Sequence, residues 1–575
     1  MPGRERPDIL HPGSPNLRIV VVQQEAGIRL QPPELGWRHV LPVTLAVFAI
    51  YAASTWMRTL PVISQDELGF IAQSQLLAGV PAVNMGSAPY YHFGYSLLLT
   101  PVWWVTRDPL LAYKGFMLIN AALAALLVPL LVGIAAALGY RRNLAMVAAA
   151  AVVALWPSYF FVAHYAWSEA LFRLVFATHV WALLRLVQRP RIGWATLFAT
   201  SAAALYAVHP KALLILLLAP VALVVLRVMR ALDTRALLVA VLAFVLAAAG
   251  ALLAMDALRG ALWHAGGHST ATALLARLLN PEALLTGLAV MLGQVWYQLA
   301  ASLGLAALGI WFVLRVATGG SAPALRLATG YVLAAVLVVG LASVAQMLDP
   351  QRVDHVAYGR YVDGASLVLI WLGLCWLTFG ERGEGQRIAG WIAVGTILAA
   401  GVVLTMLPIV AGLEPAHPNN VAGIGWIFRI GSTPLQFFGV NSLFVAVATG
   451  LLLVLNRAGQ IALAAVFAIG SGAIISAFTA HQAQEQLAFL SADAAVIRSE
   501  APVSLYWTDA VRDHNLWSYH LQYTLATSFL DADGPLPAGA GLISHEPAAE
   551  GLACAARLPS GLFLLTNPTD AEPRC

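Results

Sequence analysis

The chain has 575 residues, of which 60% are hydrophobic and only 10% are charged. Soluble domains carry about a quarter of their residues as charged side chains, so this composition excludes a soluble globular protein. Apolar runs of roughly 20 residues recur between residues 40 and 480, and each can cross a hydrocarbon core about 30 Å thick as a helix. The net charge of +4 says little about partners, and we expect membrane lipids rather than nucleic acid.

The segment before the first apolar run, residues 1–38, is rich in arginine. It has no short apolar core followed by a small-residue cleavage site, so it does not resemble a signal peptide. We therefore expect a cytoplasmic tail at 1–38 and a transmembrane domain over 39–481.

About thirteen apolar segments predict an all-α polytopic membrane protein. They lie near residues 40–57, 115–138, 143–163, 167–187, 194–208, 212–230, 236–255, 286–314, 327–347, 362–379, 388–411, 434–456 and 460–480. The apolar piece at 92–104 is short and is interrupted by Gly94 and Pro101, so we expect a shallow or interfacial helix that does not cross.

The arginines predict the orientation. If 92–104 does not cross, the alternate short loops lie on the same side as the N-terminal tail, in agreement with the positive-inside rule. These loops contain Arg141, Arg142, Arg185, Arg189, Arg191, Arg227, Arg230, Arg235, Arg315, Arg326, Arg382, Arg387 and Arg457. The segment 58–114 is then one long extracytoplasmic loop, on the same side as the loops 257–285, 348–361 and 413–433.

The tail at 482–575 is predicted to be a small extracytoplasmic α/β domain. It mixes polar and apolar residues and has a Gly/Pro-rich stretch at 534–541. It would cover the outer face or bind an acceptor, and a simple structural cap is an equal alternative. Cys554 and Cys575 could pair in an oxidising compartment, although their spacing alone leaves the pairing open.

Two adjacent acids, Asp66 and Glu67, follow the first span within the outer loop. A carboxylate in a partly dry site can accept a proton from an acceptor hydroxyl, and its surroundings can tune its pKa for that task. Two solvated surface acids are the alternative. The same loop also contains Tyr90, Tyr91 and His92, so acids, aromatic rings and an imidazole occur together.

Glu169 lies at the outer end of the fourth predicted span. Ionisable groups at the end of a membrane helix are costly to desolvate and are often functional. Arg173 follows four residues later, so an i,i+4 ion pair within one helix is the alternative interpretation.

The two lysines of the chain, Lys114 and Lys211, both fall on the predicted outer side, against the positive-inside trend. An anionic phosphate at that surface would give them a partner, whereas the alternative is that they extend to lipid headgroups. Tyr358 and Arg360 precede the tenth span. An arginine there can make two hydrogen bonds to a phosphate, and an aromatic anchor in the interface is the alternative.

These motifs together resemble the GT-C superfamily of integral-membrane glycosyltransferases, which use polyprenyl-phosphate sugars. The resemblance covers roughly residues 40–365 and is greatest to the protein O-mannosyltransferase and lipid A aminoarabinose transferase group, with bacterial arabinofuranosyltransferases and mannosyltransferases beside it. Its elements are the acid pair, the helix after it, the acid of the fourth span, His209-Pro210-Lys211 and Gly359-Arg360-Tyr361.

The resemblance implies a role for each candidate residue. Asp66 would be the catalytic base, with Glu67 as its neighbour, and Glu169 would orient the acceptor or the base, although many relatives have Asp there. The implied donor-phosphate ligands are Lys114, His209, Lys211, Tyr358 and Arg360. The implied substrate contacts are Tyr90, Tyr91, His92 and His355.

The implied reaction is a single displacement with inversion, which transfers a sugar to a glycan, lipid or protein of the cell envelope at the outer face of the plasma membrane. Some members bind a divalent cation such as Ca, Mg or Mn. Asp349 or Asp354 could assist, but no ligand spacing is present. The main alternative is a lipid or polysaccharide transporter or flippase, which would usually place its ionisable residues near the bilayer midplane. A non-catalytic scaffold is a third interpretation.

Overall fold

The computed structural model describes residues 35–62, 64–85, 89–263, 281–380, 383–424, 433–508, 510–511, 517–532, 534–549, 551–567 and 575. Residues 1–34 of the predicted tail, the middle parts of two predicted outer loops (264–280 and 425–432) and Arg382 lie outside the described residues.

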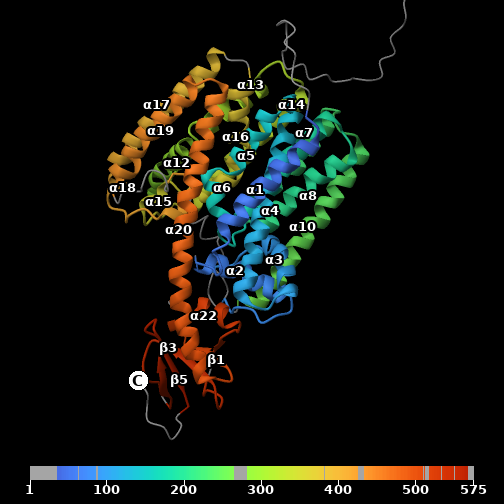
Figure 1. Ribbon diagram of the computed structural model, residues 1–575. Helices are drawn as coiled ribbons and strands as arrows, with labels where there is room; N and C mark the ends of the chain where they lie inside the picture. Colours follow the sequence, from blue (N-terminus) through green and yellow to red (C-terminus); the bar gives the residue numbers. More distant parts are fainter. Residues whose placement is uncertain are drawn as a thin grey trace, which may run out of the picture.

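The membrane part is a bundle of helices (Figure 1). Its longer helices are α1 (Val40–Thr55), α2 (Ser64–Leu77), α3 (Gly94–Val105), α4 (Pro109–Ala137), α5 (Leu144–Ala154), α7 (Glu169–Gln188), α8 (Ile192–Val208), α9 (Leu213–Val228), α10 (Thr234–Leu262), α12 (Pro281–Ala301), α13 (Leu305–Thr318), α14 (Pro323–Gln346), α16 (Arg360–Phe379), α17 (Glu384–Met406), α19 (Asn441–Val454) and α20 (Arg457–Glu500). Its short turns are η1 (Trp37–His39), α6 (Pro157–Val162), η2 (Pro210–Ala212), α15 (Val353–Val356), α18 (Pro408–Ala411), η3 (Pro418–Asn420) and η4 (Leu435–Val440).

The predicted class, an all-α polytopic membrane protein, is confirmed. Within the described residues, 10 helices are long and apolar enough to cross a membrane, or up to 11 if one bent pair counts as a single span. Two shorter apolar helices, α5 and α8, accompany them. The number thirteen remains a prediction, because length and composition alone do not decide whether these shorter helices cross.

Two predicted spans are broken in the structure. The segment 286–314 forms α12 and α13, which are bent by 100° relative to each other. Leu303 and Gly304, at the bend, have φ values of 51° and 74°, a left-handed conformation that ends the first helix. The segment 143–163 is interrupted before Pro157, whose ring disfavours a helical conformation in the residue before it.

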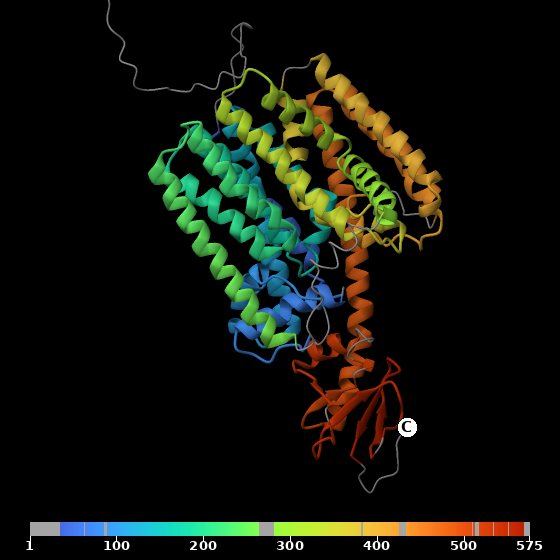
Figure 2. The same ribbon diagram turned by 180° about the vertical axis from the view of Figure 1, so that it is seen from behind.

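The helix α20 continues well beyond the membrane part. It has 44 residues, which corresponds to a length of about 66 Å at 1.5 Å per residue. Figures 1 and 2 show it running from the bundle to the C-terminal domain. The predicted domain boundary at residue 481 therefore falls inside one continuous helix, which connects the two parts.

The C-terminal domain is built on a five-stranded sheet in the order β2-β1-β3-β5-β4. The strands are β1 (Leu505–Trp507), β2 (Leu530–Asp531), β3 (Gly541–Ser544), β4 (Ala553–Arg557) and β5 (Phe563–Thr566), and α22 (Trp517–Leu525) connects the parallel pair β1 and β2. A disulfide joins Cys554 and Cys575. The α/β character predicted for the tail is present, and the pairing left open by the sequence is formed.

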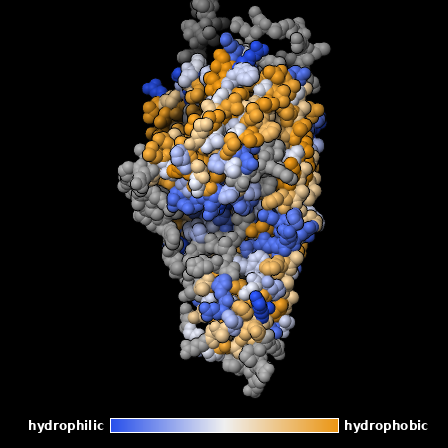
Figure 3. All heavy atoms as spheres, turned by 90° about the vertical axis from the view of Figure 1, so that its left-hand side faces the viewer, coloured by the Kyte–Doolittle hydropathy of each residue, from blue (hydrophilic) through white to orange (hydrophobic). Residues whose placement is uncertain are grey.

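The C-terminal domain contacts the loop that carries the acid pair. The side chain of Gln522, on α22, accepts a hydrogen bond from the backbone N–H of Asn84 at 3.0 Å. The hydroxyl of Tyr519 donates to the carbonyl of Met85 at 3.4 Å, and that of Tyr523 donates to the carbonyl of Pro109. In Figure 3, apolar residues cover the upper part of one face and hydrophilic residues lie below them, toward this domain.

The two ends of α20 provide a test of the predicted orientation. Glu485, whose side chain is 68% exposed, lies beyond the predicted outer surface, and Arg457 begins the same helix at the opposite end. A membrane-impermeant maleimide should label Glu485→Cys in intact spheroplasts and should label Arg457→Cys only after permeabilisation. The native cysteines are buried or form the disulfide, so the background is low. The reverse labelling pattern would overturn the orientation.

Candidate active site

Arg360 connects two carboxylates that lie far apart in the sequence. Its Nη1 is 2.5 Å from Oδ2 of Asp66, and its Nε is 2.8 Å from Oε1 of Glu169. The side chains of Arg360 and Glu169 are 11% and 3% exposed, whereas that of Asp66 is 32% exposed. The guanidinium also lies 3.7 Å from the ring centroid of Trp167. We call Arg360, Asp66, Glu169 and Trp167 the arginine cluster.

Each charged member of the arginine cluster lies in the first turn of a helix. Asp66 belongs to α2, Glu169 begins α7 and Arg360 begins α16. The free N–H groups at a helix start favour carboxylates, which suits Asp66 and Glu169. They disfavour a cation, so Arg360 depends on the two acids. The fold therefore brings three helix starts together, and α2 also packs against α22 of the C-terminal domain.

Asp66 is held in its ionised form. Tyr91 donates its hydroxyl proton to Oδ1 at 2.8 Å, while Arg360 binds Oδ2. Burial opposes ionisation, but the Arg360 charge and the two hydrogen bonds outweigh it and hold the pKa of Asp66 below its usual value. Asp66 is thus an acceptor at neutral pH, with part of its side chain open to solvent.

Glu67 has a different environment. It is completely buried, its Oε1 accepts the backbone N–H of Val62 at 2.8 Å, and its Oε2 accepts that of Ala166 at 2.8 Å and the hydroxyl proton of Tyr113. These bonds fasten the start of α2 to the segment that precedes Glu169. Its contacts suit a structural role beside Asp66.

Lys211 is a buried cation next to the arginine cluster. The residue is only 6% exposed, and its Nζ lies 4.2 Å from the ring centroid of Phe172 and 5.6 Å from that of Tyr361. In the part of the chain that the structure describes, neither Lys211 Nζ nor Glu169 Oε2 has a hydrogen-bond partner. Burying an ammonium without a hydrogen bond is costly, so this arrangement favours an anionic ligand.

A row of rings continues from Lys211 along the same side. The imidazole of His209 packs edge-on against Phe172 and Tyr361, with centroid distances of 6.3 and 5.4 Å, and Tyr358 follows 4.8 Å from Tyr361. Burial, assisted by the charge of Lys211, holds the pKa of His209 well below its usual value. His209 is therefore neutral at pH 7, and the cations of this group are Arg360 and Lys211.

The predicted substrate contacts of the first loop separate in the structure. Tyr91 binds Asp66, as described above. Tyr90 donates its hydroxyl proton to the carbonyl of Met255 at 2.7 Å, and Nδ1 of His92 lies 2.5 Å from the carbonyl oxygen of Tyr206. Tyr90 and His92 thus pack against α10 and α8.

Two other predicted residues have their contacts elsewhere. Nζ of Lys114 lies 4.7 Å from the ring centroid of Trp56, at the end of α1. His355 is half-buried, and its Nδ1 accepts the backbone N–H of Gln351 at 3.2 Å. Its ring is 6.4 Å from that of Tyr358, so it lies at the edge of the aromatic row.

Arg173 does not form the i,i+4 ion pair considered from the sequence. Its Nε donates to the backbone carbonyl of Glu169 at 3.2 Å, while the Glu169 carboxylate binds Arg360. A cation 191 residues away along the chain has replaced the local one. The local pattern was informative about helix position but not about the partner.

Asp363 is a buried acid that no sequence motif marked as functional. Its Oδ2 accepts the hydroxyl proton of Tyr297 at 3.0 Å, and its Oδ1 accepts the amide of Gln298 at 3.0 Å. It lies three residues after Arg360, one helical turn further into the bundle. That spacing was visible in the sequence, but its partners on α12 were not.

The residues proposed for a divalent cation do not fit one. Both carboxylate oxygens of Asp354 bind Arg352, at 3.0 and 3.1 Å, and Asp349 is exposed and accepts a hydrogen bond from Gln351 at 3.0 Å. Among the described residues, no group of three or more His, Cys, Asp or Glu side chains is placed to hold a metal ion.

Comparison with known proteins bears on the fold. No family model and no curated protein sequence matches the chain. Among solved structures, it is similar to ArnT from Cupriavidus metallidurans bound to undecaprenyl phosphate, with a TM-score of 0.52 and 14% identity over 93% of this chain and 100% of ArnT. The apo structure of the same ArnT has a TM-score of 0.52 and 14% identity over 92% of this chain and 99% of ArnT. The chain has the GT-C fold.

The GT-C fold predicted from short motifs is thus confirmed. The matched region necessarily includes part of the tail, because it covers 93% of the chain. EmbB from Mycobacterium smegmatis is also similar, at 16% identity over 93% of this chain and 50% of EmbB, but its TM-score of 0.42 is too low to add an argument. This chain spans about half the length of EmbB. Identities this low establish the GT-C fold and not the substrate.

The pairing of Asp66 makes a prediction about acid stability. A carboxyl whose folded pKa lies below its unfolded value of about 3.9 contributes stability above that pH, and the contribution is lost as the pH falls through the folded pKa. Asp66→Asn should therefore lower the melting temperature at pH 7, and the difference from the native protein should shrink as the pH falls below about 4. Glu485→Gln, an exposed acid, is the control. A difference that stays constant down to pH 3 would contradict the prediction.

Proposed function

We propose that the protein is a membrane glycosyltransferase that transfers a sugar from a polyprenyl-phosphate donor to a cell-envelope acceptor at the extracytoplasmic face. The observation that carries this proposal is the arginine cluster with Lys211 beside it, two buried cations with two acids at the ends of three helices. Cations suit a phosphate, and an ionised carboxylate that is partly open to solvent suits an acceptor hydroxyl.

The similar structure supports the donor class. ArnT shares the GT-C fold and was solved with undecaprenyl phosphate bound. A polyprenyl phosphate needs an apolar path for its chain and a cationic site for its headgroup. Lys211 and Arg360 offer the cationic site here, and the row of His209, Tyr361 and Tyr358 offers rings that can line the lipid or the sugar.

The proposed reaction is one displacement at the anomeric carbon with inversion. The acceptor oxygen forms a bond to that carbon while its proton passes to Asp66, and the bond from the carbon to the phosphate oxygen breaks. The electron pair of that bond leaves with the polyprenyl phosphate, so negative charge grows on the departing oxygen. Arg360 and Lys211 would stabilise this charge, and no metal ion is required in the scheme.

A flippase or transporter would use the same lipid without breaking a bond. In the proposed orientation the arginine cluster lies on the outer side of the bundle, at the starts of α2, α7 and α16, whereas transporters usually bind near the bilayer midplane. An enzyme and a transporter are best distinguished by a variant that loses sugar transfer and still binds the lipid.

Asp66→Asn is the first variant for this purpose. It keeps the size of the side chain and removes the base, so we expect sugar transfer to fall by about 10²- to 10⁴-fold with undecaprenyl phosphate binding retained. Transfer is measured with purified protein in nanodiscs, and Glu414→Gln, an exposed acid in an outer loop, is the control. Unchanged transfer by Asp66→Asn would rule out this base.

Lys211→Met tests the phosphate site. Methionine is similar in length and apolar, and the native ammonium has no hydrogen bond to lose, so the variant should be at least as stable as the native protein. Undecaprenyl phosphate should bind roughly tenfold or more weakly, because a hydrogen bond to a charged group contributes about 1.5–3 kcal/mol. Lys211→Arg should retain most of the affinity. Native affinity in Lys211→Met would exclude Lys211 from the site.

A further inference from the structure

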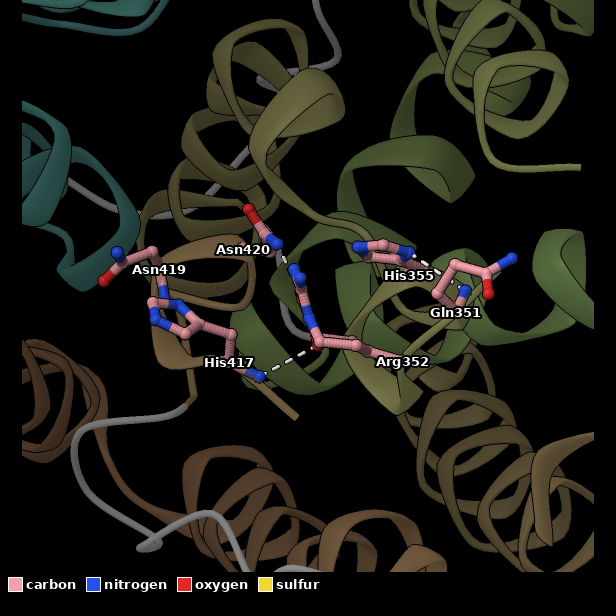
Figure 4. A network of polar contacts seen from close by, with 7 residues as sticks. Gln351, Arg352, His355, His417, Asn419 and Asn420 are labelled. Carbon is pink, nitrogen blue, oxygen red and sulfur yellow. Dashed lines mark hydrogen bonds and ion pairs between the residues drawn. The ribbon is translucent and has the colours of Figure 1, made fainter. Parts of the chain in front are cut away.

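A second polar network, formed by other side chains, includes residues that shortly precede Arg360 in the sequence. It joins the segment before α16 to the loop that contains η3 (Figure 4). Its centre is Asp354, whose side chain is completely buried. Its other members are Arg352, His417 and Asn420.

All the contacts of the Asp354 carboxylate are made within this network. Oδ1 accepts from Nε of Arg352 at 3.0 Å and from the backbone N–H of His417 at 2.8 Å. Oδ2 accepts from Nη2 of Arg352 at 3.1 Å and from Nδ2 of Asn420 at 2.6 Å. A two-pronged arginine pair and two further donors satisfy the buried charge, so it has no need of a metal or a ligand.

The network reaches Arg360 through the backbone. Asn420, whose side chain binds Asp354, uses its own carbonyl to accept the N–H of Gly359 at 3.0 Å. Gly359 precedes Arg360 directly and has no room for a side chain, because an added Cβ would lie 1.8 Å from a ring atom of Tyr297. The carbonyl of Asn420 therefore holds the residue directly before α16.

The same loop holds the first turn of α16 at a second point. The hydroxyl of Tyr297 donates to Asp363 at 3.0 Å and accepts the N–H of Gly423 at 2.9 Å. Two further backbone bonds, between Val353 and Glu414 at 3.0 Å and between Glu414 and Gln351 at 3.1 Å, run alongside. Arg360 is thus held between two fixed points, while its side chain extends across to α2 and α7.

We propose that Asp354 is a positioning residue for Arg360: through Asn420 and Gly359 it sets the start of α16 so that one guanidinium reaches both Asp66 and Glu169. The expected effect on donor binding rests on the proposed function, since a displaced Arg360 would also bind the donor phosphate poorly. A bond of 2.5 Å and another of 2.8 Å on one guanidinium leave little tolerance for a shift of the helix start.

A double-mutant cycle tests this positioning role. Asp354→Asn keeps the shape of the side chain and removes the charge that Arg352 and Asn420 bind. We expect it to weaken binding of undecaprenyl phosphate in nanodiscs about tenfold, and to have little further effect in the Arg360→Lys background, because Asp354 acts through Arg360. Glu414→Gln is the matched control, since it removes a charge from the same loop pair and leaves the backbone bonds in place.

A second readout needs no donor. If Asp354→Asn displaces Arg360, the pKa of Asp66 should rise. The stability difference between proteins with Asp66 and with Asp66→Asn should then be lost at a higher pH in the Asp354→Asn background than in the native background. A purely structural Asp354 would lower the melting temperature without moving this pH dependence. Should Asp354→Asn not fold, Asn420→Ala, which removes only the 2.6 Å bond, replaces it in both experiments.

The possible results separate the two proposals. Equal effects of Asp354→Asn in the native and Arg360→Lys backgrounds, together with an unmoved pH dependence, would overturn the positioning role. Arg360→Gln, which removes the charge, is measured beside them: native lipid affinity in that variant would overturn the proposed phosphate role of Arg360, while the shifted pH dependence would still support the positioning role.

Discussion

The arrangement of this site depends on one requirement, that a guanidinium at the start of a helix must find counter-ions. The helix start repels Arg360 and attracts Asp66 and Glu169. Removing one partner of a buried ion pair costs about 3–5 kcal/mol, because the other charge is left uncompensated. The ion pairs of Arg360 therefore link the stability of the starts of α2, α7 and α16. Glu67 and Asp354, buried acids with backbone or arginine partners, hold two of these starts in place.

This requirement also explains why the polar elements gather at one end. A membrane interior offers no water to solvate a misplaced charge, so acids and cations of the bundle must meet at its edge or pair inside it. The C-terminal domain reinforces the same end, because α22 packs on α2 and bonds to the loop at Asn84 and Met85. The continuous helix α20 joins that domain to the bundle.

Much of the fold was predictable because the length of an apolar run is a property of the sequence itself. The short helix near 92–104 was predicted and is present as α3 (Gly94–Val105), and the GT-C fold was predicted from short motifs such as Gly359-Arg360-Tyr361. The breaks at Gly304 and Pro157 were missed, since an apolar run contains no period that marks a bend. The different environments of Asp66 and Glu67 could not be predicted from the sequence either, because the contacts of Glu67 come from Tyr113 and Ala166, which lie far along the chain.

The site residues, like the fold, were predictable only in part. Arg360 and Lys211 were expected to bind a phosphate because they are cations on the predicted outer side. Their actual neighbours could not be read from spacing. The local candidate for Glu169 was Arg173, four residues on, and the structure uses Arg360 instead. Tertiary contacts between helices decided each of these cases, and no local pattern records them.

The arginine cluster suggests how proton transfer and departure of the phosphate are coupled in the proposed reaction. In the free protein the formal charges of Asp66, Glu169, Arg360 and Lys211 sum to zero. When Asp66 accepts the acceptor's proton, it becomes neutral, and Arg360 loses one of its two counter-ions. At the same moment the leaving polyprenyl phosphate gains a negative charge. Arg360 is then a stronger partner for the phosphate than it was in the ground state, which is the property required of a group that stabilises a transition state.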